Sequence, residues 1–145
     1  MSTKEIQSNL ADDMEQWMKI EDAAVATTGE IIEKTQHPVI RLVMEIIQRD
    51  SLMHHRVQEF IKASLTEQPV AITPDELVDV WTMIEKHIDI EKKTVETALA
   101  ALDAIKDKKM VVQEYLLNYL LTDERKHDAM LDTLNTIKKG MYPYG

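Results

Sequence analysis

Acidic and histidine side chains recur at helical spacing in four parts of this sequence, and these residue types can bind a metal ion. The clearest stretch is Asp123-Glu124-Arg125-Lys126-His127, in which Glu124 and His127 stand three residues apart and share one face of a helix. Carboxylate oxygens and imidazole nitrogens together suit iron, manganese or zinc. The candidate metal ligands are Glu21, Asp50, His54, His87, Glu91, Glu124 and His127.

Four long helices are predicted to position these residues. Pro38 fits the first turn of a helix, and Thr73-Pro74-Asp75-Glu76 has a capping threonine, a proline at the first position and a glutamate three residues after the cap. The charged segment 106–109 interrupts two apolar periodic runs. The predicted helices are residues 3–35, 38–64, 74–106 and 109–139.

The hydrophobic seams of these helices repeat in pairs. The second and fourth predicted helices match at a separation of 73 residues, which aligns His54 with His127, and the first and third match at 70, which aligns Glu21 with Glu91. Apolar steps of three and four residues form the inward stripe of a bundle helix. We therefore predict an all-α fold, a four-helix bundle built from two similar helical hairpins, as a single domain over residues 1–145.

Each predicted seam is interrupted near its middle by the acidic or histidine residues named above. Burying an isolated carboxylate costs several kcal/mol unless it is paired, protonated or bound to a cation. A hydrogen-bonded network without metal is the alternative for any one of these residues. Their coincidence at one level on four helices favours a metal site.

This arrangement resembles the ferritin-like superfamily, and within it the rubrerythrin-like di-iron carboxylate proteins. That family supplies one glutamate from each of two helices and Glu-x-x-His from each of the other two. Glu21 and Glu91 match the single glutamates, and Glu124 to His127 matches Glu-x-x-His. In the family, the aspartate at the position of Asp123 orients a ligating histidine, and a nearby tyrosine such as Tyr119 can hydrogen-bond or carry an electron, although such tyrosines more often only pack. The resemblance implies iron, with zinc or manganese as alternatives.

The second predicted helix departs from the family pattern, because Ser51 stands where the second Glu-x-x-His would have its glutamate. Asp50 and His54 still share a face there, and His87 could compensate. The linker from Thr66 to Thr73 spans at most ~30 Å, against a helix length of ~45 Å. A long crossover between these helices would need their ends to unwind or lie asymmetrically, and a plain up-down-up-down connection is the alternative.

Composition narrows the function classes. The chain has 145 residues, a net charge of −9 and no cysteine, so disulfides, thiolate metal sites and cysteine nucleophiles are excluded. The sequence does not predict the basic face that nucleic-acid-binding proteins usually have, so we do not expect nucleic acid as a partner. The start of the chain has no apolar segment of signal-peptide length, and no run approaches a membrane span, so we expect a cytoplasmic protein without membrane contact.

The leading functional hypothesis is a metal-binding ferritin-like protein. Its more specific form is a di-iron oxidoreductase with ferroxidase or peroxidase chemistry. It would need an electron donor protein, and the resemblance implies a homodimer. The alternative is a non-catalytic helical bundle that keeps a degenerate metal site and acts in stress response or partner binding. A metal-free signalling or adaptor bundle is a third hypothesis, and it predicts that Glu21 or Glu91 faces solvent.

Overall fold

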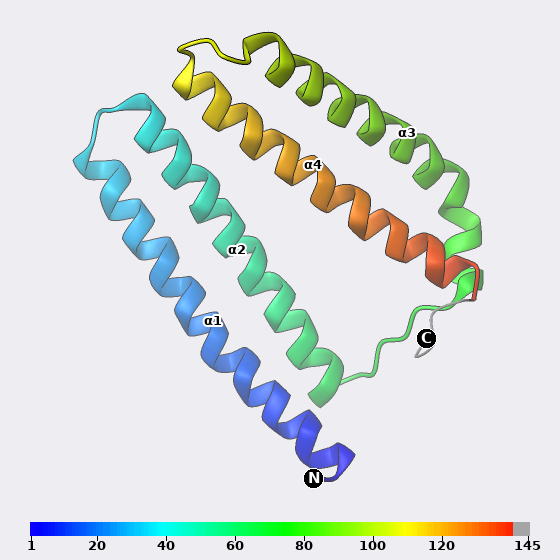
Figure 1. Ribbon diagram of the computed structural model, residues 1–145. Coiled ribbons are helices and arrows are strands. Elements are labelled where there is room, and N and C mark those ends of the chain that lie inside the picture. Colours follow the sequence, from blue (N-terminus) through cyan, green and yellow to red (C-terminus); the bar gives the residue numbers. More distant parts are fainter. Residues whose placement is uncertain (141–145) are drawn as a thin grey trace. The chain divides into compact units, whose positions relative to one another are not determined.

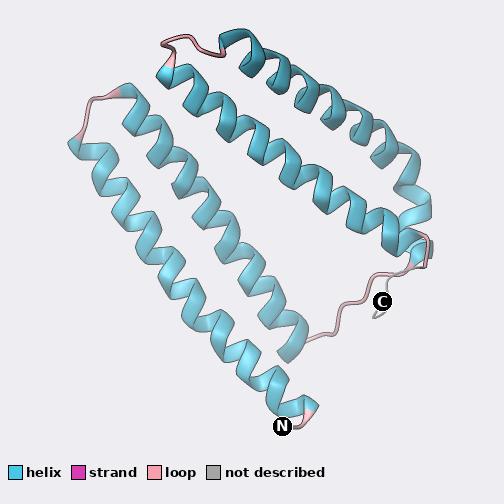
Figure 2. Cartoon of the chain, in the orientation of Figure 1, coloured by secondary structure: helices cyan, strands magenta, loops and turns pink. Residues whose placement is uncertain are grey.

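A computed structural model describes residues 1–140, and these residues form helices and loops without a strand (Figures 1 and 2). The helices are α1 (Thr3–Lys34), α2 (Pro38–Thr66), α3 (Pro74–Ile105) and α4 (Val111–Lys138). Helix α1 packs along α2, and α3 packs along α4. This confirms the predicted all-α class and the pairing of the four helices into two similar hairpins.

Each hairpin forms a compact unit of its own, one within residues 1–70 and the other from residue 71 onward. The two are therefore described separately. The single domain expected from the chain length stays a prediction.

The helix starts follow the local signals in the sequence. Thr73 and Glu76 form a capping box, with the Thr73 amide donating to Glu76 Oε2 over 2.6 Å, and Ser2 and Glu5 form another at the start of α1. Pro38 occupies the first turn of α2, as predicted. The predicted ends are close to those observed, although α2 continues to Thr66 and α4 begins only at Val111.

The turn between α1 and α2 is held by Arg41. Its Nη1 donates to the carbonyl oxygens of Ile32 over 2.6 Å and Thr35 over 2.9 Å. These carbonyls lie at the end of α1, where intrahelical donors run out. A charged side chain on α2 therefore satisfies the C-terminus of α1.

Close contact between α1 and α2 depends on Gly29. A Cβ atom at this position would lie 3.3 Å from Nε2 of Gln48, and that nitrogen donates to the Val25 carbonyl over 3.2 Å. The small residue leaves room for the amide to reach the backbone of α1. Met14 and Thr28, which are buried, continue the same contact along α1.

The α3–α4 hairpin closes at residues 106–110, where the sequence predicted a break. Asp107 has a φ of 62°, in the left-handed region that short polar residues tolerate. Along the helices Leu77, Ala98 and Leu121 are buried. Near the other end of the hairpin, the ammonium group of Lys138 lies 4.7 Å from the centre of the Trp81 ring, a cation–π contact.

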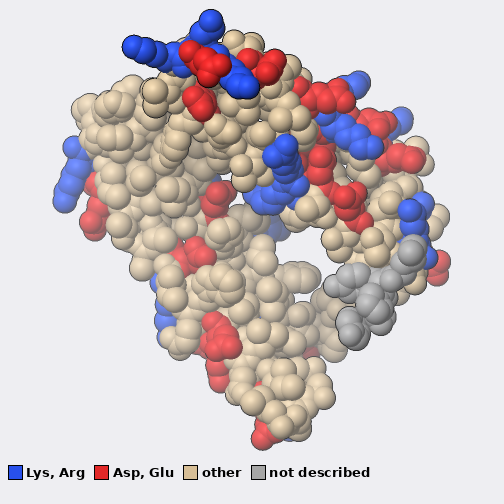
Figure 3. Space-filling model, in the orientation of Figure 1, with Lys and Arg blue, Asp and Glu red and all other residues tan. Residues whose placement is uncertain are grey.

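The outer surface of α3 is charged with both signs. Figure 3 shows acidic and basic side chains interspersed along it and at the turn that follows. In residues 1–140, no helix has the length and apolar character needed to cross a membrane.

Candidate metal centre on the α3–α4 hairpin

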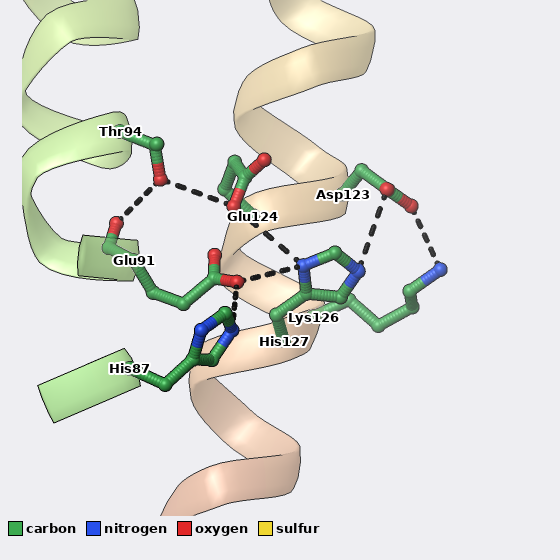
Figure 4. A network of polar contacts seen from close by, with 7 residues as sticks. All are labelled: His87, Glu91, Thr94, Asp123, Glu124, Lys126 and His127. Carbon is green, nitrogen blue, oxygen red and sulfur yellow. Dashed lines mark hydrogen bonds and ion pairs between the residues drawn. The ribbon is translucent and has the colours of Figure 1, made fainter. Parts of the chain in front are cut away.

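Glu91 of α3 and Glu124 and His127 of α4 form a compact group of potential ligands. One oxygen or nitrogen from each lies within 4.8 Å of the others. Nδ1 of His127 is 3.4 Å from Glu91 Oε1 and 3.6 Å from Glu124 Oε2 (Figure 4). Three of the seven predicted ligands are therefore brought together within a single hairpin.

The helices account for this convergence. Glu124 and His127 are three residues apart on α4, so their side chains project from the same face. Glu91 lies on the buried stripe of α3, seven residues before the buried Ala98. Because α3 packs directly along α4, this stripe presents Glu91 to the two α4 side chains.

Glu91 is the most deeply buried member of the group. Its residue is only 7% exposed, and its Oε2 is buried with no hydrogen-bond donor among the described residues. An orphaned carboxylate oxygen costs free energy unless a proton or a cation compensates it. The atom without a partner thus belongs to the residue that faces Glu124 and His127.

The two glutamates compete for a proton when no cation is present. The pKa of Glu124 is raised, chiefly by its hydrogen bond with Glu91, and burial adds to this effect. The pKa of Glu91 is lowered, chiefly by the same hydrogen bond, with His87 and His127 contributing. Two close carboxyl groups share a proton in this way because both cannot ionise freely. In the metal-free protein, a proton is therefore bound more tightly by Glu124 than by Glu91.

His87 and Thr94 hold the two carboxyl groups in place. Nε2 of His87 lies 2.8 Å from Glu91 Oε1. The Thr94 hydroxyl is 3.1 Å from Glu124 Oε2 and 2.7 Å from the Glu91 carbonyl oxygen, so it can donate to either. His87 was predicted as a ligand, but while its Nε2 donates to Glu91 that nitrogen is not free to bind a metal. Its position favours a supporting role.

Asp123 lies on the far side of the His127 ring. Its Oδ2 is 3.6 Å from Nε2 of His127, and its Oδ1 is 2.7 Å from Nζ of Lys126. Figure 4 shows the ring presenting Nδ1 to the glutamates and Nε2 to Asp123. This is the placement expected of a residue that orients a ligating histidine, although 3.6 Å is longer than a hydrogen bond. Tyr119 is half-buried one turn earlier on α4. The roles of both residues stay predictions.

The other predicted ligands lie in the α1–α2 hairpin. Nδ1 of His54 is 3.2 Å from Oε1 of the buried Glu21, and the same oxygen accepts from Nε2 of Gln58 over 3.3 Å. Asp50 is exposed, and no group of three potential ligands among residues 1–140 includes it. It corresponds to Asp123 of α4 at the separation of 73 residues.

Thr94 and Gln58 are polar partners of the site glutamates that the sequence analysis did not select. Thr94 is three residues after the buried Glu91, and Gln58 is seven residues after the buried Ser51, so each projects from the same side of its helix as a buried residue. Gln58 is itself buried, whereas Thr94 is exposed. Their helical spacing from a buried residue was the feature of the sequence that could have identified these two partners. Neither side chain is ionisable, so a selection of acidic and histidine residues does not include them.

Apolar grooves lie on both sides of the ligand group. One, of 470 Å³, is lined by His87, Glu91, His127 and the apolar residues Met130, Leu131 and Leu134. The other, of 310 Å³, extends from Glu124 and Thr94 to Leu117 and Leu120. Apolar walls strengthen electrostatic interactions at the group, and the grooves leave its atoms accessible to small molecules.

Comparison of the chain with protein-family models, with curated proteins and with solved structures gives no match. The ferritin-like resemblance therefore depends on the residues quoted above and on the helical pattern. Function is argued from the chemistry of the site.

Proposed function

We propose that this chain is a metal-binding protein of the ferritin-like kind, and that Glu91, Glu124 and His127 hold the ion. The observation that carries the proposal is Glu91 Oε2, a buried carboxylate oxygen without a donor that belongs to a group of three potential ligands. Charge, burial and ligand chemistry all favour a cation at this place.

The ligand set favours iron, manganese or zinc. Two carboxylates and one imidazole are harder donors than a thiolate set, and the chain has no cysteine. Three protein ligands leave coordination positions open, which is typical of catalytic metal sites. Iron is the metal that the family resemblance implies.

The surrounding residues would position the ligands. His87 would hold Glu91, Thr94 would hold Glu124, and Asp123 would keep the ring of His127 turned toward both. With iron, such a site supplies the chemistry of ferrous oxidation by oxygen or peroxide. The groove beside Glu91 and His127 admits molecules of that size. An electron donor protein and a homodimer belong to this proposal through the resemblance.

A second candidate function is a non-catalytic metal site. The buried Ser51, 5% exposed, supplies no carboxylate where the di-iron pattern has one. In that case the ion stabilises the fold or a partner complex and undergoes no redox cycle. Peroxide-dependent oxidation of bound ferrous iron separates the two candidates.

The experiment is reconstitution of the full chain with ferrous iron under anaerobic conditions and, separately, with zinc, followed by elemental analysis. We expect bound metal in the native protein and its loss in Glu91→Ala and His127→Ala. Glu85→Ala, an exposed acidic position on α3, is the matched control and should retain metal. Absence of metal from the native protein, or equal loss in the control, would refute the proposal.

A further inference from the structure

The same glutamate–histidine pair occurs in both hairpins. In α1–α2, Nδ1 of His54 lies 3.2 Å from Glu21 Oε1, and in α3–α4, Nδ1 of His127 lies 3.4 Å from Glu91 Oε1. Both glutamates are 7% exposed. The pairs are built from the same atoms at nearly the same distance, so the repeat seen in the sequence is also a repeat of the site.

The hairpins differ at two positions around this pair. The position of Glu124 on α4 corresponds to Ser51 on α2, and the position of Leu131 corresponds to Gln58, both at a separation of 73 residues. Ser51 and Gln58 are 5% and 3% exposed. The differences are therefore buried beside the glutamates and bear directly on how each carboxylate is compensated.

In α1–α2 the compensation comes from an amide. Nε2 of Gln58 donates to Glu21 Oε1 over 3.3 Å, and no second carboxylate adds negative charge. In α3–α4 the corresponding leucine offers no donor, Glu124 adds a second acid, and Glu91 Oε2 has no partner. The Gln58 amide therefore compensates the buried carboxylate of Glu21, whereas Glu91 requires a proton or a cation for the same purpose.

The number of ligands follows the same division. The α3–α4 hairpin brings three potential ligands within reach of one ion, and the α1–α2 hairpin brings only Glu21 and His54. Two ligands, one of them already accepting from an amide, bind a metal weakly compared with three. Gln58 also leaves its own Oε1 buried without a donor, so an apolar residue in its place removes one unsatisfied atom.

We propose that the α1–α2 hairpin is a copy of the metal site that no longer binds an ion. Ser51 supplies no carboxylate ligand, and the amide of Gln58 donates to Glu21 in place of the cation. The chain then binds a single ion, on α3–α4, and the residues at positions 51 and 58 decide this stoichiometry. The inference depends on the proposed function, because it presupposes that the α3–α4 group binds metal.

The test is to restore a third ligand to the α1–α2 hairpin and to remove the Gln58 amide, within the whole chain of 145 residues. The double variant Ser51→Glu/Gln58→Leu gives α1–α2 the residue types of α3–α4. Zinc content is measured by equilibrium dialysis and elemental analysis, with circular dichroism to check helicity. We expect about one zinc ion per chain in the native protein, about two in the double variant, and about one when Glu91→Gln is added to it, since each three-ligand group binds one ion.

Glu21→Gln in the otherwise native protein provides the second measurement, since it does not depend on folding of the double variant. It should leave one zinc ion bound with unchanged affinity, whereas Glu91→Gln should remove it. Two ions in the native protein, a loss of zinc in Glu21→Gln, or one ion in a folded double variant would overturn the inference while the proposed function stands. No zinc in the native protein would instead overturn the proposed function.

Discussion

In the α3–α4 hairpin, Nδ1 of His127 lies 3.4 Å from Oε1 of Glu91, while the opposite nitrogen of the ring lies 3.6 Å from Asp123. The histidine thus stands between two carboxylates and turns the nitrogen nearer the helix interface toward the glutamates. A neutral ring with its proton on Nε2 points a lone pair from Nδ1 into the group. This is the tautomer that a metal would require.

Replacing Glu124 by its neutral isostere separates metal binding from folding. In Glu124→Gln, zinc affinity should fall more than about 100-fold, because a ligand is lost and such a loss exceeds the cost of altering a supporting residue. The metal-free protein should keep its stability or gain about 1 kcal/mol, since the amide can donate to Glu91. Calorimetric titration and urea unfolding measure the two effects. Glu96→Gln, exposed on α3, is the control, and a similar loss of affinity there would contradict the assignment.

The hydroxyl of Thr94 should matter for metal affinity although it binds no metal itself. Thr94→Val keeps the side-chain shape and removes the donor 3.1 Å from Glu124 Oε2. We expect zinc to bind about tenfold more weakly, the lower end of the range for a residue that orients a ligand. Thr97→Val removes a hydroxyl that contacts only its own helix backbone and should leave affinity unchanged. Equal effects in the two variants would rule out a positioning role for Thr94.

Metal binding should weaken as the pH falls, and Glu124 should respond first. Its pKa is raised by the hydrogen bond with Glu91, so it takes up a proton at a higher pH than an ordinary glutamate, and the proton competes with the ion. The pKa of Glu91 is lowered, so Glu91 stays ionised further into acid. Binding should therefore release protons in weakly acidic solution. Calorimetry in buffers of different ionisation enthalpy counts these protons, and Glu124→Gln should abolish the part due to Glu124.

The same shifts act in opposite directions on the stability of the metal-free protein. The raised pKa of Glu124 contributes stability that is complete below its unfolded pKa and is lost as the pH rises through its folded pKa. The lowered pKa of Glu91 contributes stability above its unfolded pKa that is lost as the pH falls through its folded pKa. In Glu124→Gln only the Glu91 contribution remains, so stability should fall more clearly with acid. Thermal unfolding between neutral pH and pH 3 tests this.

Arg41 should stabilise the α1–α2 hairpin through the end of α1. Arg41→Met retains much of the apolar side chain and removes the donors to the Ile32 and Thr35 carbonyls. We expect a loss of about 1.5–3 kcal/mol, the range for hydrogen bonds to a charged group. Urea unfolding followed by circular dichroism measures it, with the exposed Arg56→Met as the matched control. Zinc affinity should not change, because Arg41 lies outside the α3–α4 group.

Gly29 should reveal how closely α1 approaches α2. Alanine is about 1 kcal/mol better than glycine inside a helix, but its Cβ would lie 3.3 Å from Gln48 Nε2. Gly29→Ala should therefore stabilise the protein by about 1 kcal/mol in a Gln48→Ala background and by less in the native background. A double-mutant cycle in urea gives the difference. Full additivity would show that Gln48 moves aside without cost.

Much of the architecture follows from local signals. The capping box at Thr73 and Glu76, the proline at Pro38 and the charged break at 106–109 mark helix ends through backbone chemistry within a few residues. Apolar periodicity then identifies the stripe on each helix that packs, and the separations of 70 and 73 residues predict that the two hairpins are similar. The spacing of Glu124 and His127 similarly placed both on one face of a helix.

The sequence by itself thus determined the four helices, their pairing and the list of ionisable residues on their buried stripes. Only the tertiary structure decided which of those residues meet. A periodic pattern fixes the face of a helix but not the rotation and axial offset against its neighbour, and those set the side-chain distances. They place Glu91 against Glu124 and His127 with an oxygen left unpaired, give Glu21 the amide of Gln58, and leave Asp50 exposed.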